Sequence, residues 1–210
     1  MPGAIELDHL VYGVPHLLDG VGQFAAATGV EPTAGGRHLG RGTANYLVGL
    51  GARTYLEIIG PDPEAPDPEQ PRLFGVDAFK PPRLLTWCVR TDDLDGRIAV
   101  ARSRGYDPGD PVEMSRKAAT GEMLRWRLTP DTIQRTSGTV PFLIDWGQSR
   151  HPASSEMPQL ELAALTVHGP EPDRIRGQLD SLGLDLVVDY AERSGLRAVL
   201  GTPNGDVALR

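Results

Sequence analysis

The sequence predicts an α+β fold of tandem βαβββ modules, in which a cup-shaped sheet carries its helices on the outer face. Three similar segments begin at positions 7, 85 and 162, each with a short apolar run followed by a helical stretch. Each helical stretch ends at a glycine, which suits a left-handed helix cap. These nearly equally spaced glycines are Gly29, Gly105 and Gly183. The 25 glycines and 19 prolines favour many turns between short strands.

Each predicted helix has one apolar stripe at helical spacing. The stripes consist of Leu17, Leu18, Val21, Phe24 and Ala25 in the first helix, Leu94, Ile98 and Ala101 in the second, and Ile175, Leu179 and Leu182 in the third. Asp92 and Asp93 are start signals for the second helix, and Pro172 and Asp173 for the third. Each segment therefore reads as a strand, a helix and further strands.

Strand-like runs follow each of the three glycines. They are ANYLVGL and TYLEIIG, then MLRWRLT and VPFLIDW, and finally DLVVDY, LRAVLGT and DVALR. A proline-rich stretch and a small, polar stretch separate the segments. The predicted organisation is a first βαβββ module at 1–60, a proline-rich linker at 61–83, a second module completing the cup at 84–147, a linker at 148–158, and a third βαβββ-like module at 159–210.

Composition narrows the function classes. The net charge of −7 lacks the basic footprint typical of nucleic-acid binding, so no nucleic-acid partner is expected. Cys88 is the single cysteine, which excludes an intrachain disulfide and favours a reducing, cytoplasmic setting. No apolar run reaches membrane-spanning length, so no membrane partner is expected either. A homodimer is expected, because closed two-fold assemblies are the commonest.

Several runs resemble the vicinal oxygen chelate superfamily, which includes glyoxalase I, extradiol dioxygenases and bleomycin-resistance proteins. LDHLVYGVP, GGRHLGRGTAN and YLEIIGPDP are similar to its glyoxalase-like domain subgroup, and LRWRL and PFLIDWG resemble the second module. The resemblance implies two modules that pair into a cup holding a small molecule. Because the fold hosts isomerases, dioxygenases, thiol transferases and non-catalytic binders, it implies no single activity.

The resemblance also implies a divalent metal in the cup, held by histidine and glutamate from the first and last strands of each module. His9 and Glu57 match these positions in the first module. In the second, the first-strand position falls on Trp87, which cannot bind a metal, and the last strand offers Ile144 or Asp145. Asp145 is a metal ligand only if its strand presents it inward. A divalent ion (Zn, Ni, Mn or Fe) and no metal at all are equally compatible with this set.

The strand pattern by itself supports a role for His9 and Glu57. Strand alternation places His9 on one face with Leu7 and Val11, as a core histidine or a cup-facing one. Glu57 interrupts the apolar run at 55–59, so a buried carboxylate there needs a partner, a metal or a proton. A desolvated glutamate can act as a general base.

The stretch GGRHLGRGTAN, residues 35–45, lacks the third glycine and the following helix of a nucleotide-binding loop. It reads either as a plain glycine turn or as a bend at Gly35 and Gly36 that directs His38 and Asn45 into the cup. Its two arginines are expected to face solvent. His38 is a second candidate for proton transfer, and both His38 and Asn45 are candidate ligand-binding residues.

The second module carries three tryptophans, Trp87, Trp126 and Trp146, which either pack in the core or form an aromatic wall for a ligand. Trp87 and Trp126 are the predicted ligand contacts. Two functions follow. One is a lyase or isomerase acting on a vicinal-oxygen substrate, with metal assistance or with acid–base chemistry at Glu57 and His38. The alternative is a non-catalytic protein that binds or sequesters a small molecule. His16, His151 and His168 receive no role.

Overall fold

The computed structural model describes residues 3–38, 40–69, 71–118, 121–154 and 156–210. Two βαβββ units come first. The first consists of β1 (Glu6–Gly13), α1 (Leu17–Thr28), β2 (Thr33–His38), β3 (Thr43–Gly51) and β4 (Thr54–Pro61). After a 3-10 turn, η1 (Leu73–Gly75), the second consists of β5 (Arg83–Arg90), α2 (Leu94–Ser103), β6 (Val112–Ala118), β7 (Met123–Leu128), α3 (Ile133–Thr136) and β8 (Phe142–Asp145).

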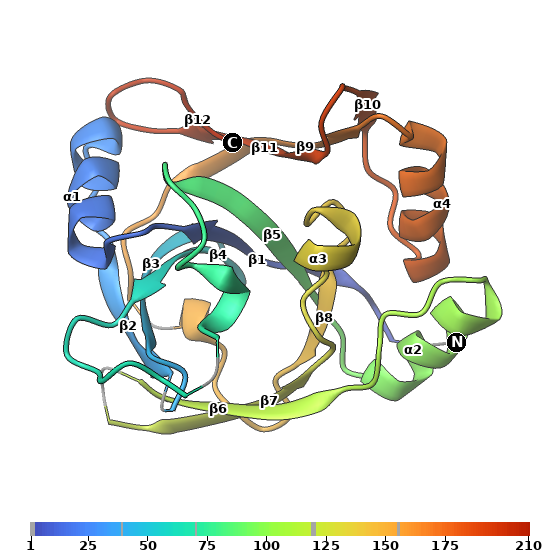
Figure 1. Cartoon of the computed structure of the whole chain (residues 1–210), viewed down its shortest axis with the longest axis horizontal. Coiled ribbons are helices and arrows are strands. Elements are labelled where there is room, and N and C mark those ends of the chain that lie inside the picture. Colours follow the sequence, from blue (N-terminus) through green and yellow to red (C-terminus); the bar gives the residue numbers. More distant parts are fainter. Residues whose placement is uncertain (1–2, 39, 70, 119–120, 155) are drawn as a thin grey trace.

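The eight strands of these units close into one barrel with the order β1-β4-β3-β2-β6-β7-β8-β5 (Figure 1). In each half, the first strand pairs in parallel with the last, as β1 does with β4 and β5 with β8. Antiparallel pairing of β1 with β5 and of β2 with β6 joins the halves. The predicted cup is therefore a closed barrel, with α1 and α2 on its outside.

Two barrel strands, β2 and β6, were not among the strand-like runs of the sequence. β2 has the sequence TAGGRH and β6 the sequence VEMSRKA, so one is rich in glycine and the other in charge. Neither shows the apolar run that marks a strand. They pair with each other through Gly36 with Ala118 and Arg37 with Lys117, and this pairing completes the barrel.

The helices follow most of their predicted stripes. All three predicted contacts of α2 are buried, as are the three of α4 (Pro172–Leu182). In α1, however, the side chain of Leu18 is 58% exposed. Asp93 caps α2 by accepting a hydrogen bond from the Gly96 amide at 3.0 Å. Gly29 and Gly183 take the left-handed conformation that ends α1 and α4.

The C-terminal segment forms a separate four-stranded sheet. It consists of β9 (Glu161–Gly169), α4, β10 (Val188–Tyr190), β11 (Gly195–Gly201) and β12 (Val207–Leu209), after a short turn, η2 (Pro152–Ser154). Its strand order is β10-β9-β11-β12, so the first strand pairs in parallel with the second rather than with the last. The segment has the element order of the barrel halves but a different topology. The expected homodimer stays a prediction, which the mass of the protein in solution would test.

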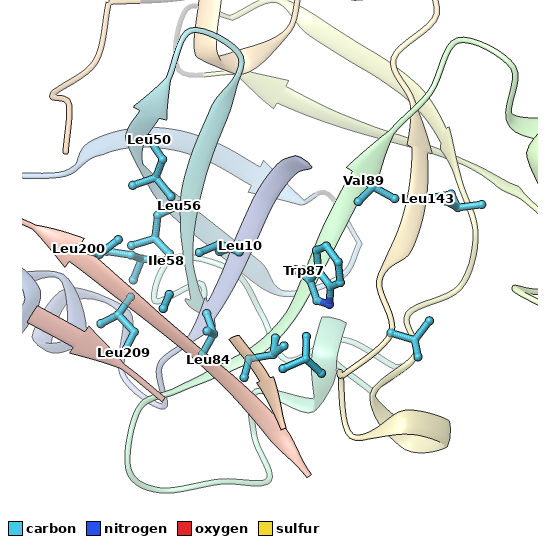
Figure 2. Close-up of a cluster of buried hydrophobic side chains, with 14 of the residues drawn as sticks. Leu10, Leu50, Leu56, Ile58, Leu84, Trp87, Val89, Leu143, Leu200 and Leu209 are labelled. Atoms are coloured by element: carbon cyan, nitrogen blue, oxygen red, sulfur yellow. The ribbon is translucent and has the colours of Figure 1, made fainter. Parts of the chain in front are cut away.

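The second sheet covers the outer wall of the barrel (Figure 1). Figure 2 shows Leu200 and Leu209 of this sheet beside Leu10 and Ile58 of the barrel, all within one buried hydrophobic cluster. Trp87 belongs to the same cluster. A second cluster, which includes Val11, Cys88, Trp126 and Phe142, lies inside the barrel. Because the barrel is closed, the C-terminal segment covers its outer apolar face rather than a free sheet edge.

In the part of the chain that the structure describes, no helix is both long and apolar enough to cross a membrane.

Candidate functional site

A cavity of about 250 Å³ opens inside the barrel. Both halves of the barrel line it, together with the segment between them. Its main polar lining residues are His9, His38, Arg41, Asn45, Glu57 and Arg116. Its main apolar lining residues are Phe74, Met114, Trp126, Phe142, Ile144 and Trp146. A largely apolar pocket with a few convergent polar groups is the usual form of a small-molecule site.

A bulge in β1 brings two neighbouring polar residues into the interior. The pairing of β1 with β5 shifts register between Leu7 and His9, so Asp8 is the extra residue. Leu7 consequently packs against the outer cluster, whereas His9 lines the cavity. The sequence-based placement of Leu7 and His9 on one face was wrong, because simple alternation assumes an unbroken ladder.

Asp8 is the centre of a buried hydrogen-bond network. It accepts from His9 Nδ1 at 2.6 Å, His151 Nε2 at 2.9 Å and Trp146 Nε1 at 3.0 Å. Burial by itself would raise the pKa of Asp8, but the hydrogen bonds and charges of the two histidines outweigh it and hold that pKa well below its usual range. The ionised carboxylate fixes the His9 ring, whose other nitrogen, Nε2, is turned toward Glu57.

Glu57 lies between two histidines and an asparagine, and it is only 6% exposed. Its Oε1 accepts a hydrogen bond from Asn45 Nδ2 at 2.5 Å. His9 Nε2 is 3.8 Å from Oε2, and His38 Nε2 is 3.9 Å from Oε1. These distances leave Glu57 Oε2 without a direct hydrogen bond among the described residues, so it is free to accept a proton from a ligand.

His38 is the second histidine of the cavity, and its Nδ1 is 3.1 Å from Thr43 Oγ1. Burial lowers the pKa of His38 to about 4; the charge of Glu57 opposes this, and the charges of Arg116 and Arg41 reinforce it. The ring is therefore neutral near pH 7. A neutral imidazole can donate and accept protons at its two nitrogens.

The glycine pair at the start of residues 35–45 clears space for the site. A Cβ on Gly35 would lie 2.4 Å from Asn45 Oδ1, and one on Gly36 would lie 2.7 Å from Arg116 Nη1. Both distances are too short for a side chain. Residues 35–45 form a strand and a turn rather than a nucleotide-binding loop. Gly35 and Gly36 leave room for the side chains of Asn45 and Arg116. Of the arginines in this stretch, Arg37 pairs on the outside with Asp62 at 2.5 Å, as expected, whereas Arg41 lines the cavity.

The opposite wall of the cavity is aromatic. The rings of Trp126 and Trp146 lie 5.2 Å apart, centroid to centroid. The segment predicted as a plain linker also contributes, since Phe74 of η1 faces Phe142 at 6.0 Å. Phe74 has a φ of 57°, an uncommon value for a residue other than glycine. Arg72, which precedes η1, anchors this segment to the turn before β3 by donating to the Gly42 carbonyl at 2.9 Å.

The structure brings together five of the seven predicted site residues: His9, His38, Asn45, Glu57 and Trp126. Trp87 does not line the cavity, because it points outward into the other cluster and donates to the Thr139 carbonyl at 3.2 Å. Asp145 does not line it either; its Oδ1 accepts from the Gly147 amide at 2.8 Å. Both predictions are corrected, since the inward-facing neighbours are Cys88 and Ile144.

The strand registers explain this correction. In the first half, β1 and β4 pair His9 with Tyr55 and Val11 with Glu57. In the second half, β5 and β8 pair Cys88 with Phe142 and Arg90 with Ile144. By this register Cys88 takes the place of His9, and Ile144 takes the place of Glu57.

Besides Arg41 and Phe74, sequence reasoning missed four further residues that the site uses. Asp8 was hidden by the bulge, although it stands next to His9 in the sequence. Arg116 lies on β6, the strand without an apolar run. His151 was assigned no role because it lies in a linker, and Trp146 was not selected among the three tryptophans. A polar pair such as Asp8-His9 within an apolar strand is the signal that could have indicated the first.

A metal site needs several donor atoms that converge on one point. Among the described residues, the compact group of three possible ligands is Asp8, His9 and Cys88, whose ligand atoms lie within 4.8 Å of one another. Asp8 and His9 Nδ1 already bond each other, and burial raises the pKa of the Cys88 thiol, which opposes the thiolate that binds metals. His9, His38 and Glu57 do not form such a group. The group of Asp8, His9 and Cys88 therefore does not fit a three-ligand metal site.

Comparison with known proteins agrees with the fold. A family model described as a glyoxalase-like domain matches residues 7–183. A search of curated proteins finds no match. Among solved structures, a hypothetical protein from Staphylococcus aureus is 16% identical with a TM-score of 0.61, covering 98% of this chain and 84% of that one. Methylmalonyl-CoA epimerase from Mycobacterium tuberculosis is 17% identical with a TM-score of 0.43, covering 66% and 84%. The chain belongs to the glyoxalase-like domain family.

Proposed function

We propose that the protein is an isomerase or lyase that moves a proton on a small vicinal-oxygen substrate held in the barrel, with Glu57 as the base. The observation that carries this proposal is the placement of Glu57. Its carboxylate is buried at the cavity wall and oriented by Asn45 through Oε1, and its Oε2 makes no hydrogen bond among the described residues. A positioned, desolvated carboxylate is suited to general-base catalysis.

The chemistry follows from these positions. Glu57 takes a proton from a carbon next to a carbonyl group, and the electron pair of the broken C–H bond moves to the carbonyl oxygen as an enolate. Return of the proton to a neighbouring atom completes an isomerisation, whereas loss of a leaving group from the adjacent carbon completes a lyase reaction. His9, held by Asp8, and the neutral His38 flank the carboxylate and can hold or pass the proton.

Proton exchange with solvent tests the proposal without knowledge of the natural substrate. Hydroxyacetone and pyruvate are incubated with the protein in D₂O, and loss of the proton signals next to the carbonyl is followed by ¹H NMR. We expect wild-type protein to exceed buffer, and Glu57→Gln to lose roughly 100-fold or more of the excess rate, as for other general bases. Exchange by Glu57→Gln at the wild-type rate would exclude Glu57 as the base.

Metal dependence is separated by the same assay. Because the donor atoms do not form a three-ligand set, we expect the exchange rate to survive dialysis against EDTA and not to rise with added Zn²⁺, Ni²⁺ or Mn²⁺. Loss on chelation, with recovery by one of these ions, would support the metal-assisted version and contradict the metal-free one.

The aromatic wall favours a second candidate, a non-catalytic binder. Trp126 and Trp146 form a tilted aromatic pair in the cavity wall, which would bind a flat or apolar ligand without any chemistry at Glu57. Ligand-dependent quenching of tryptophan fluorescence in wild-type protein, with no proton exchange for any compound that binds, would favour this role over the enzyme.

A further inference from the structure

Arg116 carries a buried charge without a carboxylate partner. The residue is only 3% exposed, and its Nη1 donates to the Gly35 carbonyl. Within the described chain, no carboxylate oxygen lies within 4.0 Å of its guanidinium nitrogens, whereas Arg37 and Arg72 each bind two carboxylates. A buried cation that lacks an anion is costly, so an anionic ligand bound in the cavity would offset that cost.

Two further donors of the cavity also lack partners. Nε of Arg41 and Nε1 of Trp126 are both buried and make no hydrogen bond within the part of the chain that the structure describes. Both residues line the same cavity as Arg116. The charges of Arg116 and Arg41 contribute to the lowered pKa of His38, after its burial, which shows that both guanidinium groups act on the interior of the site. Unsatisfied donors next to a cation are the complement of an oxyanion.

Carboxylates of the cavity do not cancel these two charges. Glu57 accepts from Asn45 and forms no ion pair with Arg116 or Arg41 among the described residues, and Asp131 is exposed and accepts from the Ile133 amide at 3.1 Å. Asp8 is ionised, but two histidines and Trp146 already surround it. Among the described residues, the unpartnered buried side-chain atoms of the cavity lining are two donors, Arg41 Nε and Trp126 Nε1, and one acceptor, Asn45 Oδ1.

The backbone is shaped to admit the guanidinium. Gly36 has a φ of 152°, and the pairing of β2 with β3 shifts register between Ala34 and Gly36. A Cβ at Gly36 would lie 2.3 Å from the Lys117 carbonyl oxygen and 2.7 Å from Arg116 Nη1. The glycine bulge thus provides the space that the Arg116 guanidinium occupies. The Arg116 side chain therefore belongs to a formed site rather than to the surface.

We propose that the cavity takes a small organic anion, a carboxylate or phosphate ester with a carbonyl or hydroxyl oxygen beside it, and that Arg116 and Arg41 bind its anionic group. This inference names the substrate class of the proposed function and rests on that function for its catalytic meaning. With the anion on Arg116, the neighbouring carbonyl carbon is held within the same small cavity as Glu57.

Binding is measured in Glu57→Gln, so that no turnover is needed. The probes are pyruvate, hydroxyacetone phosphate and butane-2,3-dione, which present a carboxylate, a phosphate ester and a neutral group next to a carbonyl. Dissociation constants come from calorimetry and from quenching of tryptophan fluorescence. We expect at least one anion to bind roughly 10-fold or more tightly than the dione, with an affinity that falls as NaCl is added. The tighter of the two anions identifies the anionic group.

Three variants localise the effect. Arg116→Gln is expected to lose the preference for anions, and Arg116→Lys to keep part of it, because lysine retains the charge but not the planar fork. Arg41→Gln is expected to weaken anion binding severalfold and serves if Arg116→Gln does not fold. Arg37→Gln, whose side chain lies outside the barrel on Asp62, is the matched control and should bind as the parent does.

Equal affinity for the dione and both anions would overturn the inference, as would a full preference for anions in Arg116→Gln and Arg41→Gln. These outcomes are distinct from failure of the proposed function. Anion binding without proton exchange in wild-type protein would contradict only the catalytic role of Glu57. Exchange on neutral ketones, without preference for anions, would contradict only the substrate class.

Discussion

In the first half of the barrel, β1 and β4 turn His9 and Glu57 toward the interior, whereas β5 and β8 of the second half turn Cys88 and Ile144 there. The two halves have the same strand order and the same parallel pairing of first and last strands. Their interiors differ: one supplies acid–base groups, and the other supplies aromatic and aliphatic side chains around Arg116. Strand pairing depends on backbone hydrogen bonds, so side chains at matched positions can diverge without a change of topology.

The largest effect is expected from making the second half resemble the first. Ile144→Glu would place a carboxylate against the Trp126–Trp146 wall, where burial disfavours its charge. We expect a loss of about 3 kcal/mol in the free energy of unfolding at pH 7. Since burial raises the folded pKa of such a group, the loss should shrink as the pH falls toward 4. Urea denaturation at both pH values measures this, with Ile144→Val as control.

If the loss of stability were the same at pH 4 as at pH 7, Ile144→Glu would act through packing rather than charge. The matched change in the first half, Glu57→Gln, should alter stability by less than about 1 kcal/mol, because its amide oxygen can still accept from Asn45. Together the pair tests whether only the first half tolerates a polar group at this position.

The next effect concerns the hydrogen-bond network centred on Asp8. Asp8→Ala leaves His9, His151 and Trp146 without their shared acceptor. We expect a loss of about 3 kcal/mol at pH 7, because the donors remain buried and unpaired. Asp8→Asn keeps one acceptor oxygen and should lose less. Thermal unfolding of wild type, Asp8→Asn and Asp8→Ala measures the order of their stabilities. Equal melting temperatures for wild type and Asp8→Ala would show that the network does not stabilise the barrel.

Acid should affect the first half through His38. Its folded pKa is about 4, below the ordinary value of about 6.5. Between these values the unfolded chain binds a proton that the folded chain does not, so stability falls as the pH falls from 6.5 to 4, by about 3 kcal/mol in total. Urea midpoints across this range measure the loss. His38→Asn should flatten the profile, and an unchanged slope in that variant would assign the pH dependence to another group.

A smaller effect is expected where the connecting segment closes the cavity. Phe74→Gly removes the contact with Phe142 but also relieves the positive φ, and each change is worth about 1 kcal/mol. Stability should therefore change little, whereas ligand affinity should fall roughly tenfold as water enters the site. Calorimetry with the tightest probe, beside urea denaturation, separates the two. Phe74→Ala loses the contact without relieving the backbone and should be the less stable variant.

The smallest effect on binding is expected from the tryptophan outside the barrel. Trp87→Phe changes the outer cluster and should leave ligand affinity unchanged, because Trp87 does not line the cavity. Ligand-dependent quenching should persist through Trp126 and Trp146. Trp126→Phe is the comparison and should reduce the quenching. Loss of binding in Trp87→Phe would mean that the outer cluster controls the shape of the cavity.

The sequence by itself determined the elements that bury apolar stripes. The α2 stripe of Leu94, Ile98 and Ala101 is buried as predicted, and Gly29 and Gly183 end their helices in the left-handed conformation. Such features depend on local spacing, which a single sequence displays. The family resemblance further indicated that His9 and Glu57 face a common interior, and both line the cavity.

Only the tertiary structure decided the remainder. β2 and β6 are held by pairing with each other and with their neighbours rather than by apolar side chains, so no local pattern revealed them. The bulge at Asp8, the position of Arg116 and the contact of His151 with Asp8 all depend on strand register between distant segments. Register determines which way a side chain points, and a shift of one residue reverses it. For that reason Cys88 and Ile144, rather than Trp87 and Asp145, face the interior of the barrel.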